Sequence, residues 1–236
     1  MLTAYKIYKQ QIRNFKARGI CKRPFKYFLQ WRGSLQNGAS SVSDELPWIT
    51  FETINFLKKT LRPSFKIFEY GGGGSTLFFI KRVHSVVTVE HDKEWFKKLE
   101  QLIQNKNTTN WTGFFIEPGK GDLINNPDAA NPEHYSSLDK ASNGSNYKNY
   151  AIAIDNYADS YFDLVLVDGR SRPSCIKHTL PKIRKGGFLI LDNSDRAYYL
   201  VFFKELLEKN FNCIIDDFGP SPYSKDFTKT SVWVKK

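Results

Sequence analysis

The stretch 65–79, FKIFEYGGGGSTLFF, decides the fold. A run of β-forming residues ends at Glu69, and four consecutive glycines, 71–74, lead into a helical pattern that begins at Ser75. Glycines permit positive φ angles and let a bound molecule contact the backbone, while the first turn of a helix offers unpaired N–H groups. The stretch therefore predicts a strand, a ligand-binding loop and a helix in succession.

An acidic residue ends the next predicted strand, in VVTVEHD. Glu90 lies nineteen residues after Gly71, at the spacing that puts a carboxylate at the tip of the neighbouring parallel strand. A carboxylate there can accept both hydroxyl groups of a ribose. The loop and Glu90 together predict a nucleoside-containing cofactor, and at this point both a methyl donor and NAD fit.

Beyond residue 46 the chain alternates short β-rich runs with helical patterns, which is typical of a parallel sheet wrapped by helices. We predict an α/β fold with seven strands, at 66–69, 85–90, 112–116, 163–168, 188–192, 212–217 and 230–234. Helices are predicted at 50–60, 75–82, 93–104, 173–183 and 197–209. No helical pattern separates the last two strands, so we expect an antiparallel hairpin there.

The motifs EYGGGGS (69–75) and VTVEHD (87–92) resemble motifs I and II of the class I S-adenosylmethionine-dependent methyltransferases. The resemblance covers about 47–236 and implies a seven-stranded Rossmann-like sheet of order 3-2-1-4-5-7-6, with strand 7 antiparallel. It also implies that Glu69 shapes the loop and approaches the amino group of the cofactor, while Glu90 binds the ribose. The further cofactor contacts that it implies are Gly71, Gly73, Ser75, His91 and Asp168. Ser75 stands where the family has a third glycine.

Two other classes stay open. An NAD-dependent oxidoreductase of Rossmann type would use Glu90 equally well, although a GxGxxG fingerprint read from Gly71 ends on Thr76. A non-catalytic scaffold could have kept the fold. S-adenosylmethionine carries an activated methyl group, so a methyltransferase needs no catalytic residue on the cofactor itself.

Polar side chains end the fourth and fifth predicted strands. Asp168, Asp192 and Asn193 should meet at the carboxyl edge of the sheet, and three oxygen donors suit Mg²⁺ or another divalent cation. Their order is similar to that of the metal-dependent catechol-type O-methyltransferases. Those enzymes carry a lysine base soon after the first Asp, whereas this chain has Arg170. Without a metal, the same residues would cap strand ends or contact the cofactor.

The mechanism implied is in-line methyl transfer to a nucleophilic oxygen. Candidate bases, in order, are Asp168, Asp195 and His91. Arg170, Arg172 and Arg196 suit a carboxylate or phosphate on the acceptor. We expect a hydroxyl acceptor that is a small molecule, a glycan or lipid-linked. Nucleic acid is disfavoured as the substrate, because the sequence holds no NPPY-type tetrapeptide and no nucleic-acid module.

Nine of the 35 basic residues lie in the first 43 positions, which hold no acidic residue. We divide the chain into a basic arm (1–45) and a cofactor-binding domain (46–236). Tyr5, Tyr8, Ile12 and Phe15 line one face of a predicted helix in the arm. This face either packs on the domain or helps residues 1–32 bind an anionic membrane surface. The chain shows no signal peptide or membrane-spanning run, so a cytoplasmic location is expected, or a peripheral one at the inner membrane surface. The Pro-, Gly- and Asn-rich stretch 117–149 predicts a substrate lid or a disordered insertion.

Overall fold

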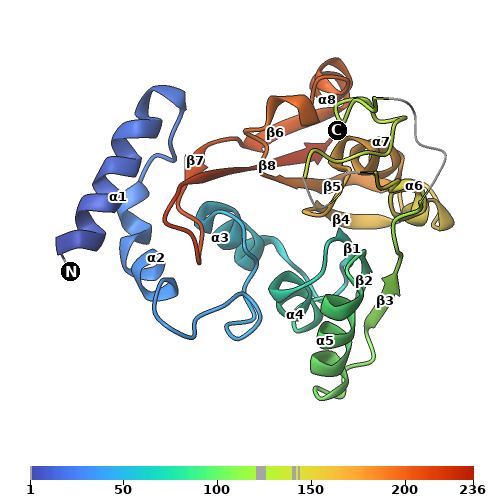
Figure 1. Cartoon of the computed structure of the whole chain (residues 1–236), viewed down its shortest axis with the longest axis horizontal. Coiled ribbons are helices and arrows are strands. Elements are labelled where there is room, and N and C mark those ends of the chain that lie inside the picture. The colour runs from blue at the N-terminus through green and yellow to red at the C-terminus, as the bar shows by residue number, and fades with distance from the viewer. Residues whose placement is uncertain (1, 121–125, 140–141, 143) are drawn as a thin grey trace.

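One mixed sheet forms the centre of the protein (Figure 1). A computed structural model describes residues 2–120, 126–139, 142 and 144–236. Within these residues the strand order is β3-β2-β1-β4-β5-β8-β6, and the short β7 pairs with β8 beyond this path. The predicted Rossmann-like order is therefore confirmed, with β8 in the place of the expected seventh strand.

The strands are parallel from β3 to β5, and β8 runs antiparallel to β5 and to β6. Their central members read as near-continuous apolar runs because helices cover both faces of such a sheet. The bounds are β1 Lys66–Tyr70, β2 Ser85–Glu90, β3 Trp111–Phe115, β4 Phe162–Val167, β5 Ile183–Asp192, β6 Phe211–Ile215, β7 Phe218–Gly219 and β8 Thr228–Lys235.

Helices connect the parallel strands, as the alternating pattern predicts. Their bounds are α3 Phe51–Thr60, α4 Gly74–Ile80, α5 Lys93–Gln104, α6 Lys148–Ile152, α7 Arg172–Lys182 and α8 Lys204–Asn210. The helix predicted over 197–209 is wrong in its first half. Backbone bonds from Tyr199 to Arg196 and from Leu200 to Ala197 span three residues, not four. They form the 3₁₀ turn η5, Ala197–Tyr199, and α8 starts only at Lys204.

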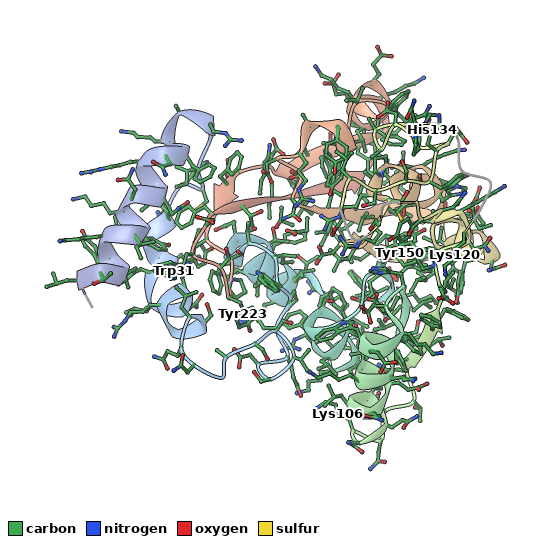
Figure 2. The ribbon with its side chains drawn as sticks, viewed as in Figure 1. Trp31, Lys106, Lys120, His134, Tyr150 and Tyr223 are labelled. Carbon is green, nitrogen blue, oxygen red and sulfur yellow. The ribbon has the colours of Figure 1, made fainter. Side chains whose placement is uncertain are left out.

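The basic arm folds as two helices, α1 Leu2–Phe15 and α2 Phe28–Ser34, beside the β7–β8 end of the sheet (Figure 1). Tyr8, Tyr27 and Trp31 are fully buried within the larger of two apolar cores. The indole of Trp31 donates to the carbonyl of Ser224, 2.7 Å away, in the segment before β8. Figure 2 labels Trp31 and Tyr223, the residue that precedes Ser224. Tyr8, Ile12 and Phe15 of the predicted stripe therefore pack on the domain, whereas Tyr5 of the same stripe is 42% exposed.

The stretch 117–149 is only partly described. Backbone bonds pair Gly119 with Asn146, and Tyr147 donates to the carbonyl of Tyr135. Residues 121–125, 140–141 and 143 of the predicted lid lie outside the described residues. A lid role for this stretch stays a prediction. No helix among the described residues is long and apolar enough to span a membrane.

Candidate functional site

The glycine loop connects β1 to α4 at the carboxyl edge of the sheet, and two of its positions require glycine. Gly71 has φ +86°, and a Cβ there would lie 2.9 Å from the carbonyl oxygen of Asp168. A Cβ on Gly74 would lie 2.1 Å from the carbonyl oxygen of Ser41, because the segment before α3 crosses the start of α4. The glycines therefore let the loop, the end of β4 and the arm-side segment approach within backbone contact.

Glu90 ends β2 beneath this loop and holds it. One carboxylate oxygen accepts the N–H of Gly72 at 3.1 Å, and the other accepts the N–H groups of His91 and Asp92 at 2.7 and 2.9 Å. Burial alone would raise the pKa of Glu90, but these hydrogen bonds and His91 lower it below the ordinary value. Glu90 is therefore a charged acceptor at the strand tip, where the sequence predicts ribose binding.

Glu69 is fully buried under the loop. Its two oxygens accept the hydroxyl groups of Ser75 and Thr88, each at 2.8 Å. Burial raises its pKa to about 7. Glu69 thus braces the loop through Ser75, in keeping with its predicted shaping role, and its approach to the cofactor stays a prediction.

A cavity of about 280 Å³ opens above the loop and is lined by Gly71, Gly73, Ser75, Glu90, His91 and Asp168. The structure thus brings every predicted cofactor residue except Glu69 to one cavity. The same cavity is also lined by Trp48 and Trp95, which the sequence analysis did not single out. The Trp95 indole donates to the carbonyl of Gly72 at 2.7 Å. The signal for Trp95 in the sequence is its position in the first turn of the helix that follows Glu90, the acid predicted to bind ribose.

His91 lies between two charged groups. Its Nδ1 is 2.8 Å from a carboxylate oxygen of Glu90, and its Nε2 is 3.3 Å from Nε of Arg170. Arg170 also forms an ion pair with Asp139 of the 117–149 stretch. Because Nε2 faces an arginine N–H, this ring orients Arg170 and is a poor candidate for the base that we predicted.

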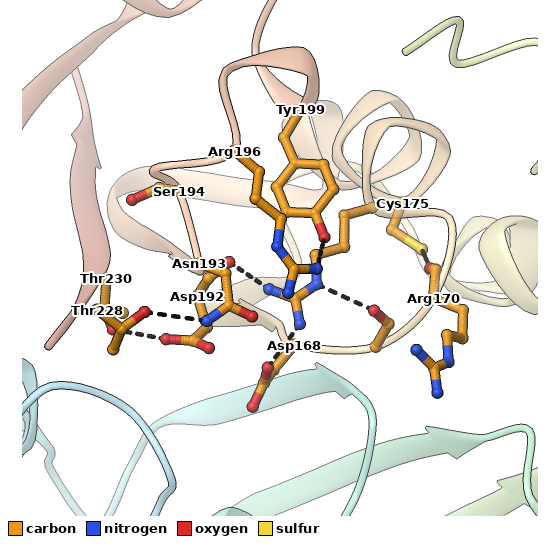
Figure 3. Close-up of polar contacts among 12 residues, drawn as sticks. Asp168, Arg170, Cys175, Asp192, Asn193, Ser194, Arg196, Tyr199, Thr228 and Thr230 are labelled. Carbon is orange, nitrogen blue, oxygen red and sulfur yellow. Dashed lines mark hydrogen bonds and ion pairs between the residues drawn. The ribbon is translucent and has the colours of Figure 1, made fainter. Parts of the chain in front are cut away.

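The predicted second constellation, Asp168, Asp192 and Asn193, does meet at the carboxyl ends of β4 and β5 (Figure 3), but Arg172 contacts two of its three members. Arg172 Nη2 lies 3.0 Å from Asp168 Oδ1, and Nη1 donates to the main-chain carbonyl of Asp192. Its Nε donates to the carbonyl of Gly169 at 3.0 Å. Burial and the negative charge of Asp192 raise the pKa of Asp168 well above its ordinary value.

Of the oxygen atoms predicted to hold a divalent cation, Asp168 Oδ1 and Asp192 Oδ1 already have partners, whereas Asn193 is bonded through its nitrogen. Asp192 Oδ1 accepts the hydroxyl of Thr230 at 2.7 Å, and the Asn193 amide donates to Thr228 at 3.1 Å. Among the described residues, no three or more His, Cys, Asp or Glu side chains are grouped to hold a metal ion. The arrangement does not fit a divalent cation while the guanidinium of Arg172 pairs with Asp168. A metal at Asp168, Asp192 and Asn193 stays a prediction that requires Arg172 to move.

The 280 Å³ cavity is called the cofactor cavity below, because it contains the residues predicted to bind the cofactor. Two further cavities adjoin it. One, of about 690 Å³, is lined by Asp168, Asp192, Asn193 and Asp195 together with Trp48 and Trp95. The other, of about 370 Å³, contains all three predicted substrate arginines, Arg170, Arg172 and Arg196. Asp195 reaches the first of them but not the cofactor cavity, whereas Asp168 lines both. Of the three candidate bases, Asp168 is thus the one that lines both the cavity at the glycine loop and the 690 Å³ cavity.

Comparison with solved structures identifies the fold. An O-methyltransferase from Bacillus cereus in complex with S-adenosylhomocysteine (SAH) superposes with a TM-score of 0.53 at 16% identity, over 99% of this chain and 100% of that one. A putative methyltransferase from Streptococcus mutans, also with SAH, gives 0.53 at 13% identity over 77% and 94%. An rRNA methylase from Streptococcus thermophilus gives 0.51 at 13% identity over 77% and 92%. No protein-family model and no curated protein matches the chain.

The chain has the fold of the class I S-adenosylmethionine-dependent methyltransferases. At these identities the likeness establishes the fold alone. Two of the similar structures were solved with SAH, which is consistent with S-adenosylmethionine as the cofactor of this fold.

Proposed function

We propose that the protein transfers a methyl group from S-adenosylmethionine to a hydroxyl group of its acceptor. The observation that supports this most is a single cavity lined by the glycine loop, by Glu90 and by Asp168. That cavity shares Trp48, Trp95, Asp168 and Arg170 with the larger cavity beside it. A cofactor on the loop would therefore present its methyl group toward space that an acceptor can enter.

The chemistry needs little from the protein beyond alignment and one proton acceptor. S-adenosylmethionine supplies a methyl group on a positively charged sulfur, so displacement by the acceptor oxygen leaves neutral SAH and one proton. Glu90 would fix the ribose, and the loop backbone would fix the rest of the cofactor. Asp168 would take the proton of the acceptor hydroxyl, because its carboxylate lines both cavities and its raised pKa favours proton uptake.

Arg172 gives Asp168 a fixed orientation. The ion pair engages Oδ1, and the guanidinium is anchored on two backbone carbonyls. An arginine stays protonated, so it cannot be the base itself. In this proposal it positions Asp168 and stabilises the carboxylate before proton transfer. The proposed acceptors remain hydroxyl compounds of the three expected kinds: small molecules, glycans and lipid-linked compounds.

Calorimetric titration with S-adenosylmethionine, SAH and NAD tests the cofactor half of the proposal. We expect micromolar binding of the first two and none of NAD, with at least tenfold weaker binding in Glu90→Gln because a charged acceptor for ribose is lost. Glu94→Gln is the matched control, since Glu94 is an exposed residue of α5 whose ion pair is with Lys97, also exposed. NAD binding would favour the oxidoreductase, and a wild-type protein that binds none of the three would favour the scaffold.

A further inference from the structure

The 370 Å³ cavity lies against the loop after β4 and the first turn of α7. Its walls come from Gly169 to Pro173, from Arg196 to Tyr199 and from the described part of the 117–149 stretch. It shares Gly169, Arg170 and Arg172 with the cofactor cavity, and Arg170 and Arg196 with the larger acceptor cavity. Arg170 therefore stands where all three cavities meet.

The charge of this cavity is not balanced within it. Arg172 pairs with Asp168, and Arg170 pairs with Asp139. Arg196 donates from Nη1 to the hydroxyl of Tyr199, 2.9 Å away, and forms no ion pair among the described residues. A guanidinium without a carboxylate, on the wall of a cavity, is a ready donor for a two-oxygen anion.

A second, independent feature is an unused hydroxyl group. Ser136 also lines this cavity and is 7% exposed. Its Oγ finds no hydrogen-bond partner in the described part of the chain. Buried hydroxyl groups are almost always paired, so one left unpaired beside an arginine cavity indicates a missing polar partner.

We propose that this cavity binds an anionic group of the methyl acceptor, a phosphate or a carboxylate, with Arg196 and Ser136 as its determinants. The proposal rests on the proposed methyl transfer, because it places a second part of the same acceptor. An anion held here would tether the acceptor beside Arg170, with its hydroxyl free to reach Asp168 in the adjoining cavity. The anion proposed here is not the carboxylate of the cofactor, because Arg196 does not line the cofactor cavity.

Titration of the SAH-saturated protein with inorganic phosphate, and separately with acetate, tests the proposal and distinguishes the two anions. We expect one of them to bind, with affinity reduced about tenfold or more in Arg196→Gln and reduced in Ser136→Ala. SAH affinity should stay within about twofold of wild type in both variants, since neither residue lines the cofactor cavity. Arg13→Gln removes an exposed arginine of α1 and should change neither titration.

Equal anion binding in wild type and Arg196→Gln, or no binding of either anion, would overturn the anion site. Failure of the proposed function has a different signature, because the wild type would then fail to bind SAH at all. A wild type that binds SAH but ignores both anions keeps the methyltransferase proposal and sinks only this one.

The basic arm carries an independent observation. Its helices bury Tyr8, Tyr27 and Trp31, yet they leave four large apolar side chains exposed: Leu2, Tyr5, Phe25 and Leu29. Leu2 and Leu29 are 77% and 74% exposed, and the rings of Tyr5 and Phe25 stack at 6.3 Å. Leu2 and Tyr5 share one face of α1 with Lys6, Lys9 and Arg13, at spacings of three and four.

None of the nine basic residues of the arm forms an ion pair within the described residues. Exposed apolar side chains bordered by uncompensated cations match the chemistry of an anionic bilayer surface. We infer that the arm docks the enzyme on anionic lipid through this face. Deleting residues 1–32 is a poor test, because it would remove Tyr8, Tyr27 and Trp31 from the core.

Point variants of the full chain avoid that problem. Sedimentation with vesicles containing phosphatidylglycerol should be salt-sensitive, and should fall severalfold in Leu29→Ser and in Lys6→Gln with Lys9→Gln. Vesicles of phosphatidylcholine alone should bind little. The control, Lys58→Gln with Lys59→Gln, removes the same charge from exposed sites on α3 and should bind as wild type. Equal binding by all variants would overturn the inference, as would binding to a nucleic-acid duplex without binding to vesicles.

Discussion

The guanidinium of Arg172 lies 3.0 Å from the carboxylate of Asp168 and also donates to the backbone of Asp192 (Figure 3). One arginine from the start of α7 thus joins the ends of β4 and β5. It supplies positive charge at the point where the order of donors in the sequence predicts a metal ion. The positive charge of Arg172 thus offsets the repulsion between the neighbouring carboxyl groups of Asp168 and Asp192.

Arg172→Ala should lower the free energy of unfolding by about 3 kcal/mol, because it leaves the buried Asp192 and the partly buried Asp168 without their counter-charge. The variant should also gain a site for Mn²⁺, which would raise its melting temperature. Wild type should melt at the same temperature with Mn²⁺ and with chelator. Thermal unfolding of both proteins under both conditions checks this.

The control for that experiment is Lys97→Gln, which breaks an exposed i,i+3 pair with Glu94 and should change stability by less than about 0.5 kcal/mol. A wild type that is itself stabilised by Mn²⁺ would contradict the prediction. Arg172 would then leave the site when a cation enters, and the predicted metal at Asp168, Asp192 and Asn193 would be favoured.

Substitution of Gly71 or Gly74 should show whether the backbone of the loop requires glycine at these two positions. Gly74→Ala and Gly71→Ala should each cost about 1–3 kcal/mol, since the first drives a Cβ into the carbonyl of Ser41 and the second forces a positive φ on alanine. Gly33→Ala in α2 meets nothing within 4 Å and should be neutral or stabilising. Urea unfolding of the three variants measures the difference. Equal stability of all three would show that the backbone approach to Gly74 is not needed.

The order of the sheet and the cofactor wall could be predicted from sequence because each depends on local pattern. The apolar runs, the glycines 71–74 and the acid Glu90 all lie within short windows, and the rules for parallel sheets bring their ends together. The burial of Tyr8 and Trp31 was left open, because an aromatic stripe at helical spacing fits a protein core and a membrane surface equally well.

The site differs from the sequence prediction where contacts between residues far apart in the chain determine how a side chain is oriented. No local pattern indicates that Arg172 points back toward Asp168 and the backbone of Asp192, since i,i+4 spacing also allows an outward side chain. His91 follows Glu90 directly, but its neighbour Arg170 is 79 residues away. The tight turn at Ala197–Tyr199 depends on the packing of Tyr199, which a helical periodicity does not report.

Trp95 should matter to the cofactor through its ring nitrogen. Trp95→Phe keeps an aromatic ring but removes the donor to the carbonyl of Gly72, so the loop loses one of its anchors. A net loss of about 1 kcal/mol, or roughly fivefold in SAH affinity, is expected. Trp48→Phe is the matched control, because Trp48 lines the same cavity without an indole hydrogen bond among the described residues. Calorimetry on both variants tests this, and equal weakening would point to ring contact with the ligand instead.

Glu69 should make stability fall as pH rises. Burial raises its pKa in the folded protein to about 7 from an ordinary value of 4.5, so the folded state holds a proton that the unfolded chain releases. The stabilisation from that proton is fully present below pH 4.5 and is lost as pH rises through about 7. The shift corresponds to about 3 kcal/mol. Glu69→Gln cannot titrate, so urea unfolding should show its stability gaining on wild type by about this amount across that window. Glu94→Gln, at an exposed carboxylate of α5, should track wild type at every pH. A constant difference between Glu69→Gln and wild type would mean that Glu69 is charged throughout and held so by Ser75 and Thr88.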